Sequence, residues 1–142
     1  MNSSAHEHDF YAWTQEQANL LKTGQLHQID WENIAAEIED MGRLEKRQLD
    51  SRLEILIMHL LKWQFQPNLR SRSRELTIKE QRLRLEKLLQ KNPSLQPHLT
   101  EAIADVYPLA TISAERETGL SLFPETSPYT LTEILSPEFL PE

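Results

Sequence analysis

The feature that most constrains the fold is a helical pattern that runs without a proline from Asp30 to Trp63. At 100° per residue, one face of this run is apolar at most positions, which is typical of a helix packed against others. That face consists of Trp31, Ile34, Ala35, Ile38, Leu49, Leu53, Leu56, Leu60 and Trp63. Because Pro67 cannot continue a helix, we expect this one to end near Gln66, with a length on the order of 50 Å.

Three further helices are predicted from the same periodicity and from helix-capping residues. The first runs from about Asp9 or Thr14 to Thr23, with Gly24 as its stop, and would bury Phe10, Trp13, Leu20 and Leu21. The third runs from about Ser71 or Ser73 to Lys91. The fourth runs from Ser94 or Leu95 to Gly119, and Pro108 should kink it.

These helices predict an all-α fold, an antiparallel four-helix bundle with one long central helix, a Pro-kinked fourth helix and a Pro-rich C-terminal tail. Only three glycines occur among the 142 residues, which argues against a β-rich fold with many tight turns. We expect one helical domain over residues 1–142, in which residues 1–8 are disordered. Residues 121–142 should form an extended tail, with a short helix at about Leu131 to Leu135 packed on the bundle.

The composition indicates a soluble, cytoplasmic protein. There is no cysteine, which excludes disulfides, thiolate metal sites and cysteine nucleophiles and suits a reducing compartment. The polar N-terminal residues 1–9 contain no apolar core of a secretory signal. The most apolar run, residues 53–63, is too short to span a bilayer, so no membrane association is expected.

Charge is distributed unevenly along the chain, whose formal net charge is −7. Residues 1–41 and residues 92–142 each carry eight acidic side chains and one Lys or Arg, whereas residues 62–91 carry nine Lys or Arg and three Glu. A candidate basic surface consists of Arg70, Arg72, Arg74, Lys79, Arg84, Lys87 and Lys91. We favour neutralisation of these charges by acidic helices of the fold over a nucleic-acid surface, because no aromatic side chains are interleaved with them.

A second set of ionisable side chains falls on the predicted inner faces of the helices. This candidate buried polar cluster is Glu45, Arg52, His59, Arg82 and Glu117. Because isolated buried charges are unfavourable, we expect an ion-pair network that fixes helix register. The alternative is a ligand site in which Arg52 or Arg82 binds a small carboxylate or phosphate. A separation of about 20 Å along the helix excludes Glu45 and His59 from one metal site.

Familiar sequence motifs for catalysis are missing. The chain has no Gly-rich phosphate loop, no G-x-S-x-G sequence, no H-E-x-x-H sequence and no Glu-x-x-His pair of a di-iron bundle. The sequence therefore predicts no catalytic residue, no cofactor and no metal.

Five segments in order cover most of residues 10–141: DFYAWTQEQANLL, IDWENIAAEIEDMGRLEKRQLDSRLEILIMHLLKWQFQP, RSRELTIKEQR, AERETGL and FPETSPY. Together they resemble the domain of unknown function 29 family, which is abundant in cyanobacteria and also found in proteobacteria. The resemblance implies a compact all-helical protein and assigns no activity, cofactor or catalytic residue. Where members of that family usually have a tryptophan near the start of the third helix, this chain has Arg74.

These observations favour a non-enzymatic protein-interaction or adaptor bundle that binds an unknown protein partner, and they leave a homodimer open. The long second helix supports this hypothesis, because it could extend beyond the others and expose apolar surface. The two alternatives are nucleic-acid binding through the basic third helix and binding of a small anion at the polar cluster.

Overall fold

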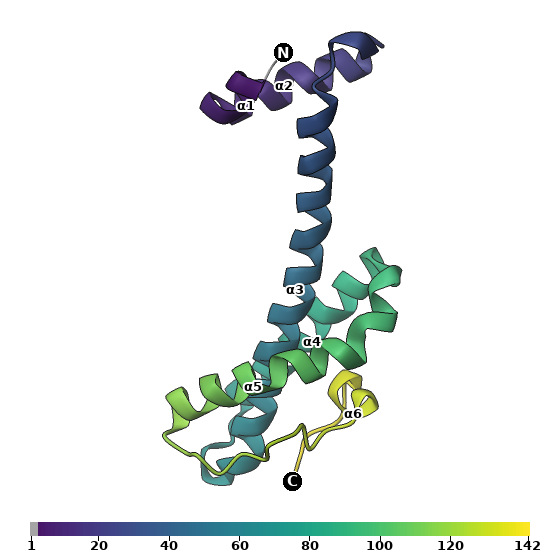
Figure 1. The fold of residues 1–142 in the computed structure, drawn as a ribbon. Coiled ribbons are helices and arrows are strands. Elements are labelled where there is room, and N and C mark those ends of the chain that lie inside the picture. Colours follow the sequence, from purple (N-terminus) through teal and green to yellow (C-terminus); the bar gives the residue numbers. More distant parts are fainter. Residues whose placement is uncertain (1–2) are drawn as a thin grey trace. The chain divides into compact units, whose positions relative to one another are not determined.

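A computed structural model describes residues 3–142, which form α-helices and short 3-10 helices and contain no strand (Figure 1). The predicted all-α class and helical bundle are therefore confirmed. The α-helices are α1 (Ser3–His8), α2 (Phe10–Lys22), α3 (Trp31–Phe65), α4 (Arg72–Lys91), α5 (Leu99–Thr118) and α6 (Leu131–Leu135). The 3-10 helices are η1 (Leu26–Gln28), η2 (Pro67–Leu69) and η3 (Pro93–His98).

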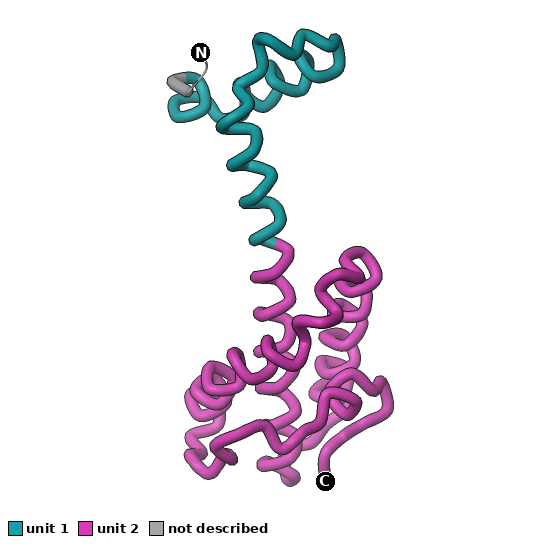
Figure 2. The backbone as a smooth tube through the Cα atoms, turned by 45° about the vertical axis from the view of Figure 1, so that its right-hand side comes forward, with its two compact units in different colours: residues 1–44 teal, residues 45–142 magenta. Residues whose placement is uncertain are grey.

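The chain divides into two compact units, which Figure 2 distinguishes by colour. Unit 1 consists of residues 1–44 and unit 2 of residues 45–142. Helix α3 contributes its first fourteen residues to unit 1 and the remainder to unit 2.

Unit 2 is built around a dense aliphatic core. Leu49, Leu53, Leu56 and Leu60 of α3 have no exposed surface, as the periodicity of this helix predicts. They belong to one cluster with Ile78 and Leu85 of α4, Leu99, Ala110 and Ala114 of α5, and Ile134 of α6. A buried leucine contributes roughly 2–3 kcal/mol by leaving water, so this cluster holds the four helices together.

Unit 1 has a much smaller core, in which Trp13, Leu20 and Ile29 are buried. Helix α2, the first of the predicted bundle helices, belongs to this unit and adds nothing to the aliphatic cluster of unit 2. Its start is fixed by Asp9, whose carboxylate accepts a hydrogen bond from the backbone N–H of Ala12.

Most predicted helix boundaries agree with the structure to within one or two residues. Helix α3 ends at Phe65 before Pro67, and α4 follows Ser71, whose hydroxyl caps the backbone N–H of Arg74. The fourth predicted helix begins later than expected, because residues 93–98 form η3. Pro97 has no N–H to donate, which disfavours α-helical hydrogen bonding at that point. Gly119 closes α5 in the left-handed conformation, with φ of 73°.

Two features of the N-terminal region differ from the prediction. Residues 3–8 form α1 where disorder was expected, and the remaining residues of that prediction, 1–2, lie outside the described residues. The apolar face at the start of α3 is not buried, since Trp31 and Ile38 are 54% and 62% exposed. Phe10 and Leu21 of α2 are also about half exposed. Periodicity identifies an apolar face, but it does not establish that another element of the same chain covers that face.

Candidate functional site

The five residues of the predicted buried polar cluster do not come together in the structure. Glu45 is partly buried and accepts hydrogen bonds from Asn92 Nδ2 at 2.7 Å and from Lys91 Nζ at 3.3 Å. These two donors, Asn92 first, lower the pKa of the Glu45 carboxyl group. The Arg52 side chain forms no hydrogen bond or ion pair with any residue that the structure describes. Glu45 and Arg52 lie on the same face of α3, as predicted, but they are not paired with each other.

Arg82 is buried and holds the C-terminal tail in place. Its Nε, Nη1 and Nη2 atoms donate to the backbone carbonyls of Ile134, Phe139 and Glu133 at 2.9, 2.7 and 3.1 Å. Burial lowers the pKa of Arg82, although the group stays charged at neutral pH. The carbonyls of Glu133 and Ile134 are at the end of α6, where no helical N–H can reach them. Arg82 therefore caps α6, and its charge needs no carboxylate there.

Of the other two members of the cluster, Glu117 lies in the last turn of α5 and His59 lies on α3. Glu117 was predicted on the inner face, but it is exposed and accepts from Lys62 Nζ at 2.8 Å. Its helical face is the one that buries Ala114, yet α5 ends at Thr118, and Ala114 is the last buried residue on it. His59 is partly buried, and its pKa is lowered chiefly by burial and then by the charge of Lys62.

The residues of the candidate basic surface fall into three groups: those hydrogen-bonded to carbonyl or amide groups of unit 2, those in ion pairs, and those whose side chains have no partner among the described residues. Arg70, which follows η2, donates to the carbonyls of Trp63, Pro141 and Glu142, and Arg74 of α4 donates to Gln66, so both hold the start of α4 and the preceding residues against neighbouring segments of unit 2. Arg72 pairs with Glu75, Arg84 with Glu80, and Lys91 with Glu45. Lys79 and Lys87 have no hydrogen-bond or ion-pair partner within the described part of the chain.

A cationic cleft of about 240 Å³ lies between α3 and α4 in unit 2. It is lined by Glu45, Gln48, Arg52, Arg84, Lys87, Leu88 and Lys91. Sequence reasoning identified all of the ionisable residues, although it assigned them to two separate features. It missed Gln48, which lies one turn before Arg52 on the same helix. The i, i+4 spacing of Gln48 and Arg52 was the signal that could have revealed it.

A larger cavity of about 490 Å³ lies between α4, η3 and the segment around α6. Its walls are mostly aliphatic, with Leu83, Leu85 and Leu89 on α4 and Leu135 and Pro137 on the tail. Arg82 also lines it, although the hydrogen bonds of its guanidinium group go to tail carbonyls. The cavity therefore depends on the same tail segment that Arg82 holds.

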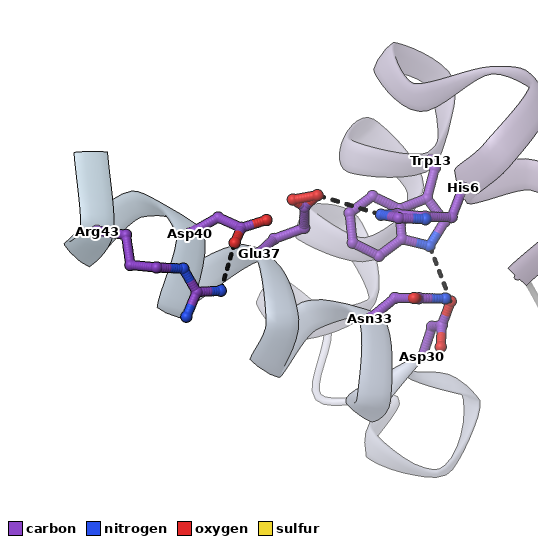
Figure 3. A network of polar contacts seen from close by, with 7 residues as sticks. All are labelled: His6, Trp13, Asp30, Asn33, Glu37, Asp40 and Arg43. Carbon is purple, nitrogen blue, oxygen red and sulfur yellow. Dashed lines mark hydrogen bonds and ion pairs between the residues drawn. The ribbon is translucent and has the colours of Figure 1, made fainter. Parts of the chain in front are cut away.

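Unit 1 contains a polar network that involves α1, α2 and the start of α3 (Figure 3). Its centre is Asp30, a buried carboxylate that accepts from Trp13 Nε1 at 3.0 Å and from Asn33 Nδ2 at 2.8 Å. The hydrogen bond from Asn33 is the largest cause of the lowered pKa of Asp30. The imidazole of His6 lies 3.2 Å from Glu37 and packs edge-on against Trp13, with 4.5 Å between ring centroids. Unit 1 is therefore an ordered structure despite its small core.

The surface of unit 1 is rich in apolar side chains. Trp31, Ile38 and Met41 of α3 are 54%, 62% and 65% exposed, and Ile34 between them is partly buried. Spacings of three, four and three residues place these four side chains on one face of α3. Sequence reasoning missed Met41, although its position three residues after Ile38 continues the pattern.

The described residues contain neither a candidate metal site nor a candidate membrane span. No group of three or more His, Asp or Glu side chains among them is arranged to hold a metal ion. None of the helices in residues 3–142 combines the length and apolarity required to cross a membrane.

Comparison with known proteins gives one finding. The sequence pattern of the family described as "Domain of unknown function DUF29" matches residues 5–140. No curated protein and no solved structure matches the chain.

Proposed function

Because the chain belongs to the Domain of unknown function DUF29 family, whose description gives no activity, we propose a function from its own surfaces: it is a protein-interaction module. In this proposal, unit 1 binds a basic amphipathic helix of a partner protein along the exposed apolar face of α3. That face, which we call the α3 stripe, consists of Trp31, Ile34, Ile38 and Met41.

The observation that carries the proposal is the concentration of exposed apolar side chains in unit 1. Fourteen large apolar side chains of the described residues are exposed, and eight of them lie within residues 1–44. The eight are Phe10, Tyr11, Leu21, Leu26, Trp31, Ile38, Met41 and Leu44. Unit 1 makes up less than a third of the chain, so this share is well above that expected from its length. A concentration of exposed apolar side chains of this kind is typical of a surface that another molecule covers.

The spacing of the α3 stripe indicates that the partner segment is helical. Trp31, Ile34, Ile38 and Met41 occupy alternate three- and four-residue steps, which are the a and d positions of a heptad. Side chains at these positions insert between those of a second helix packed alongside. A partner helix would therefore bury a stripe that water now contacts, at roughly 25 cal/mol for each Å² covered.

Charge decides between a basic partner and a second copy of unit 1. Residues 1–44 carry eight acidic side chains and only two basic ones, Lys22 and Arg43. Two copies of unit 1 face to face would bring together two surfaces of formal charge −6, which is unfavourable at low ionic strength. A helix with Lys or Arg beside its apolar positions would instead meet a surface of opposite charge.

A designed peptide tests the proposal directly. The probe is a fluorescently labelled amphipathic peptide of about three heptads with Leu at a and d and Lys elsewhere. Its matched control has Glu in place of every Lys. Fluorescence anisotropy with the full chain should show saturable binding of the Lys peptide and none of the Glu peptide.

Variants then separate the α3 stripe from general attraction between opposite charges. The double variant Ile38→Ser/Met41→Ser should weaken binding of the Lys peptide at least about tenfold, because two buried aliphatic side chains are lost from the interface. The matched control is Leu109→Ser/Ile112→Ser on α5, with the same three-residue spacing and comparable exposure of 51% and 52%. Equal effects of the two double variants would contradict the proposal.

Sedimentation velocity of the chain alone tests whether a second copy of the chain covers the α3 stripe instead of a basic partner. A monomer at low and high salt is expected from the acidity of unit 1. A dimer that Ile38→Ser/Met41→Ser dissociates would instead assign the α3 stripe to a second copy and overturn the proposal of a basic partner.

A further inference from the structure

We infer that the cationic cleft between α3 and α4 binds a small dianionic phosphate group, such as a phosphomonoester or a pyrophosphate. The inference concerns unit 2 and is independent of the interaction proposed for unit 1. It rests on the convergence of charges and unused hydrogen-bond donors within one concave site.

The lining of the cleft carries a strong excess of positive charge. Four cationic side chains line it against the single carboxylate of Glu45, which gives a formal excess of three. Glu45 is already engaged by Asn92 and Lys91. Arg84 is bound to Glu80, with Nη2 at 2.8 Å and Nε at 3.0 Å from Glu80 Oε2.

Two of the cations and one amide have no partner of their own. The side chains of Arg52, Lys87 and Gln48 make no hydrogen bond or ion pair with the residues that the structure describes. Arg52 and Gln48 project from α3, and Lys87 projects from α4, so the free donors come from opposite walls of the cleft. The like charges that line the cleft repel one another, and a bound anion reduces that repulsion.

The chemistry of the donors selects the class of anion. The planar guanidinium group of Arg52 can donate two parallel hydrogen bonds to a tetrahedral oxyanion, while Lys87 adds a compact positive charge. A dianion compensates both free cations, whereas a carboxylate compensates one. The volume of about 240 Å³ is too small for a large organic ligand and is suited to a phosphate with its immediate substituent.

Nucleic acid is a less suitable occupant. No aromatic ring lines the cleft, so there is no surface on which a base could stack. Arg70 and Arg74 at the other end of α4 are engaged with carbonyl and amide groups of unit 2. Of the two unpaired lysines of α4, Lys87 lines the cleft and Lys79 lies outside it, and the intervening Arg84 is paired with Glu80, so the unpaired charges do not form a continuous basic track.

Calorimetric titration of the full chain with pyrophosphate and with inorganic phosphate, at constant ionic strength, tests the inference. We expect saturable binding of both, with pyrophosphate the tighter ligand. The variant Arg52→Gln/Lys87→Gln should weaken pyrophosphate binding at least about tenfold.

The control removes the same charge elsewhere on the same two helices. Arg47 of α3 and Lys79 of α4 are exposed and lie outside this cleft, so Arg47→Gln/Lys79→Gln should change the affinity less than about twofold. Equal losses in the two double variants would overturn the inference, because they would indicate attraction by overall charge. Failure of pyrophosphate to bind the unmodified chain would also overturn it. A single-stranded oligonucleotide that binds more tightly than pyrophosphate, through Arg52 and Lys87, would replace a small anion with nucleic acid.

Discussion

Helix α3 carries an apolar face along most of its length, but its two parts use that face in different ways. In unit 2, Leu49, Leu53 and Leu56 have no exposed surface and form the centre of an aliphatic cluster. In unit 1, Ile38 and Met41 are more than 60% exposed. The same three- and four-residue spacing therefore stabilises the fold in one unit and presents a surface in the other.

The two units also differ in what holds them together. Unit 2 depends on many aliphatic side chains, supplemented by Arg82 at the tail. Among its described residues, unit 1 buries only three large apolar side chains, and it relies on hydrogen bonds to Asp30 from Trp13 and Asn33. A small core leaves little apolar surface to stabilise folding, so unit 1 is the unit expected to gain most from a partner.

The largest expected effect comes from truncating matched leucines in the two parts of α3. Leu56→Ala should lower the free energy of unfolding by about 3 kcal/mol, because it leaves a cavity in the core of unit 2. Leu44→Ala should change it by less than about 0.5 kcal/mol, since Leu44 is 52% exposed. Urea unfolding followed by circular dichroism measures both. A large loss of unfolding free energy in Leu44→Ala would contradict the contrast between the two units, because it would mean that Leu44 at the end of unit 1 is packed.

Arg82 tests how far unit 2 depends on a polar contact. Arg82→Met keeps the volume of the side chain but leaves the carbonyls of Glu133, Ile134 and Phe139 without their donors. We expect a loss of about 2 kcal/mol in stability and faster amide hydrogen exchange in Leu131–Leu135. Arg84→Met, which removes an exposed ion pair two residues along α4 from Arg82, is the control. Unchanged exchange in α6 would show that the tail is held by its apolar contacts alone.

The successes and failures of sequence reasoning follow from the distance over which each interaction acts. Pro67 ends α3 through local backbone chemistry, and Ser71 caps α4 three residues away, so both boundaries were predictable. The partners of Arg82 lie more than fifty residues later in the chain, and no local pattern identifies them. Its burial was predictable from the face of α4, but its role as a cap for α6 was not.

The candidate sites show the same limit. The cluster that was predicted from helical projection divides into separate groups. Projection gives the direction in which a side chain points, but it does not show how far along the helix that face is buried. Glu117 lies in the right direction but beyond Ala114, the last buried residue of that face. Arg52 and the residues of α4 were assigned to different features, since only the packing of α3 against α4 brings them to one cleft.

The dependence of stability on pH should distinguish the two units. The pKa of His59 in unit 2 is lowered from 6.5, so the unfolded chain takes up a proton at higher pH than the folded one. The stability associated with His59 is therefore full above pH 6.5 and declines as the pH falls through and below that value. The pKa of Asp30 in unit 1 is lowered from 3.8, and its contribution declines only below that value.

Midpoints of urea unfolding measured from pH 8 to pH 3 follow both declines in stability, that associated with His59 and that associated with Asp30. His59→Gln should remove the decline that begins near pH 6.5 and leave the one below pH 3.8 intact. Asp30→Asn should leave the decline near pH 6.5 intact and reduce the decline below pH 3.8, part of which comes from Glu45 and Glu117 of unit 2, whose carboxyl pKa values are also lowered. If either variant flattened both regions, the two units would not respond to acid independently.

The smallest expected effect concerns Gly42, in the exposed part of α3. Nothing lies within 4 Å of a Cβ atom placed at this position, so alanine fits without a clash. Gly42→Ala should raise the free energy of unfolding by about 0.5–1 kcal/mol, because glycine in a helix interior is less favourable than alanine. Gly119→Ala should lower it by about 1 kcal/mol, since φ of 73° at the end of α5 disfavours any side chain. Opposite shifts in the urea midpoints of the two variants are the expected result.

The same Gly42→Ala protein then sharpens the proposal for unit 1. Higher stability with weaker binding of the Lys peptide would place the backbone of the partner helix close to residue 42. Unchanged binding would place the contact nearer Trp31, at the other end of the α3 stripe.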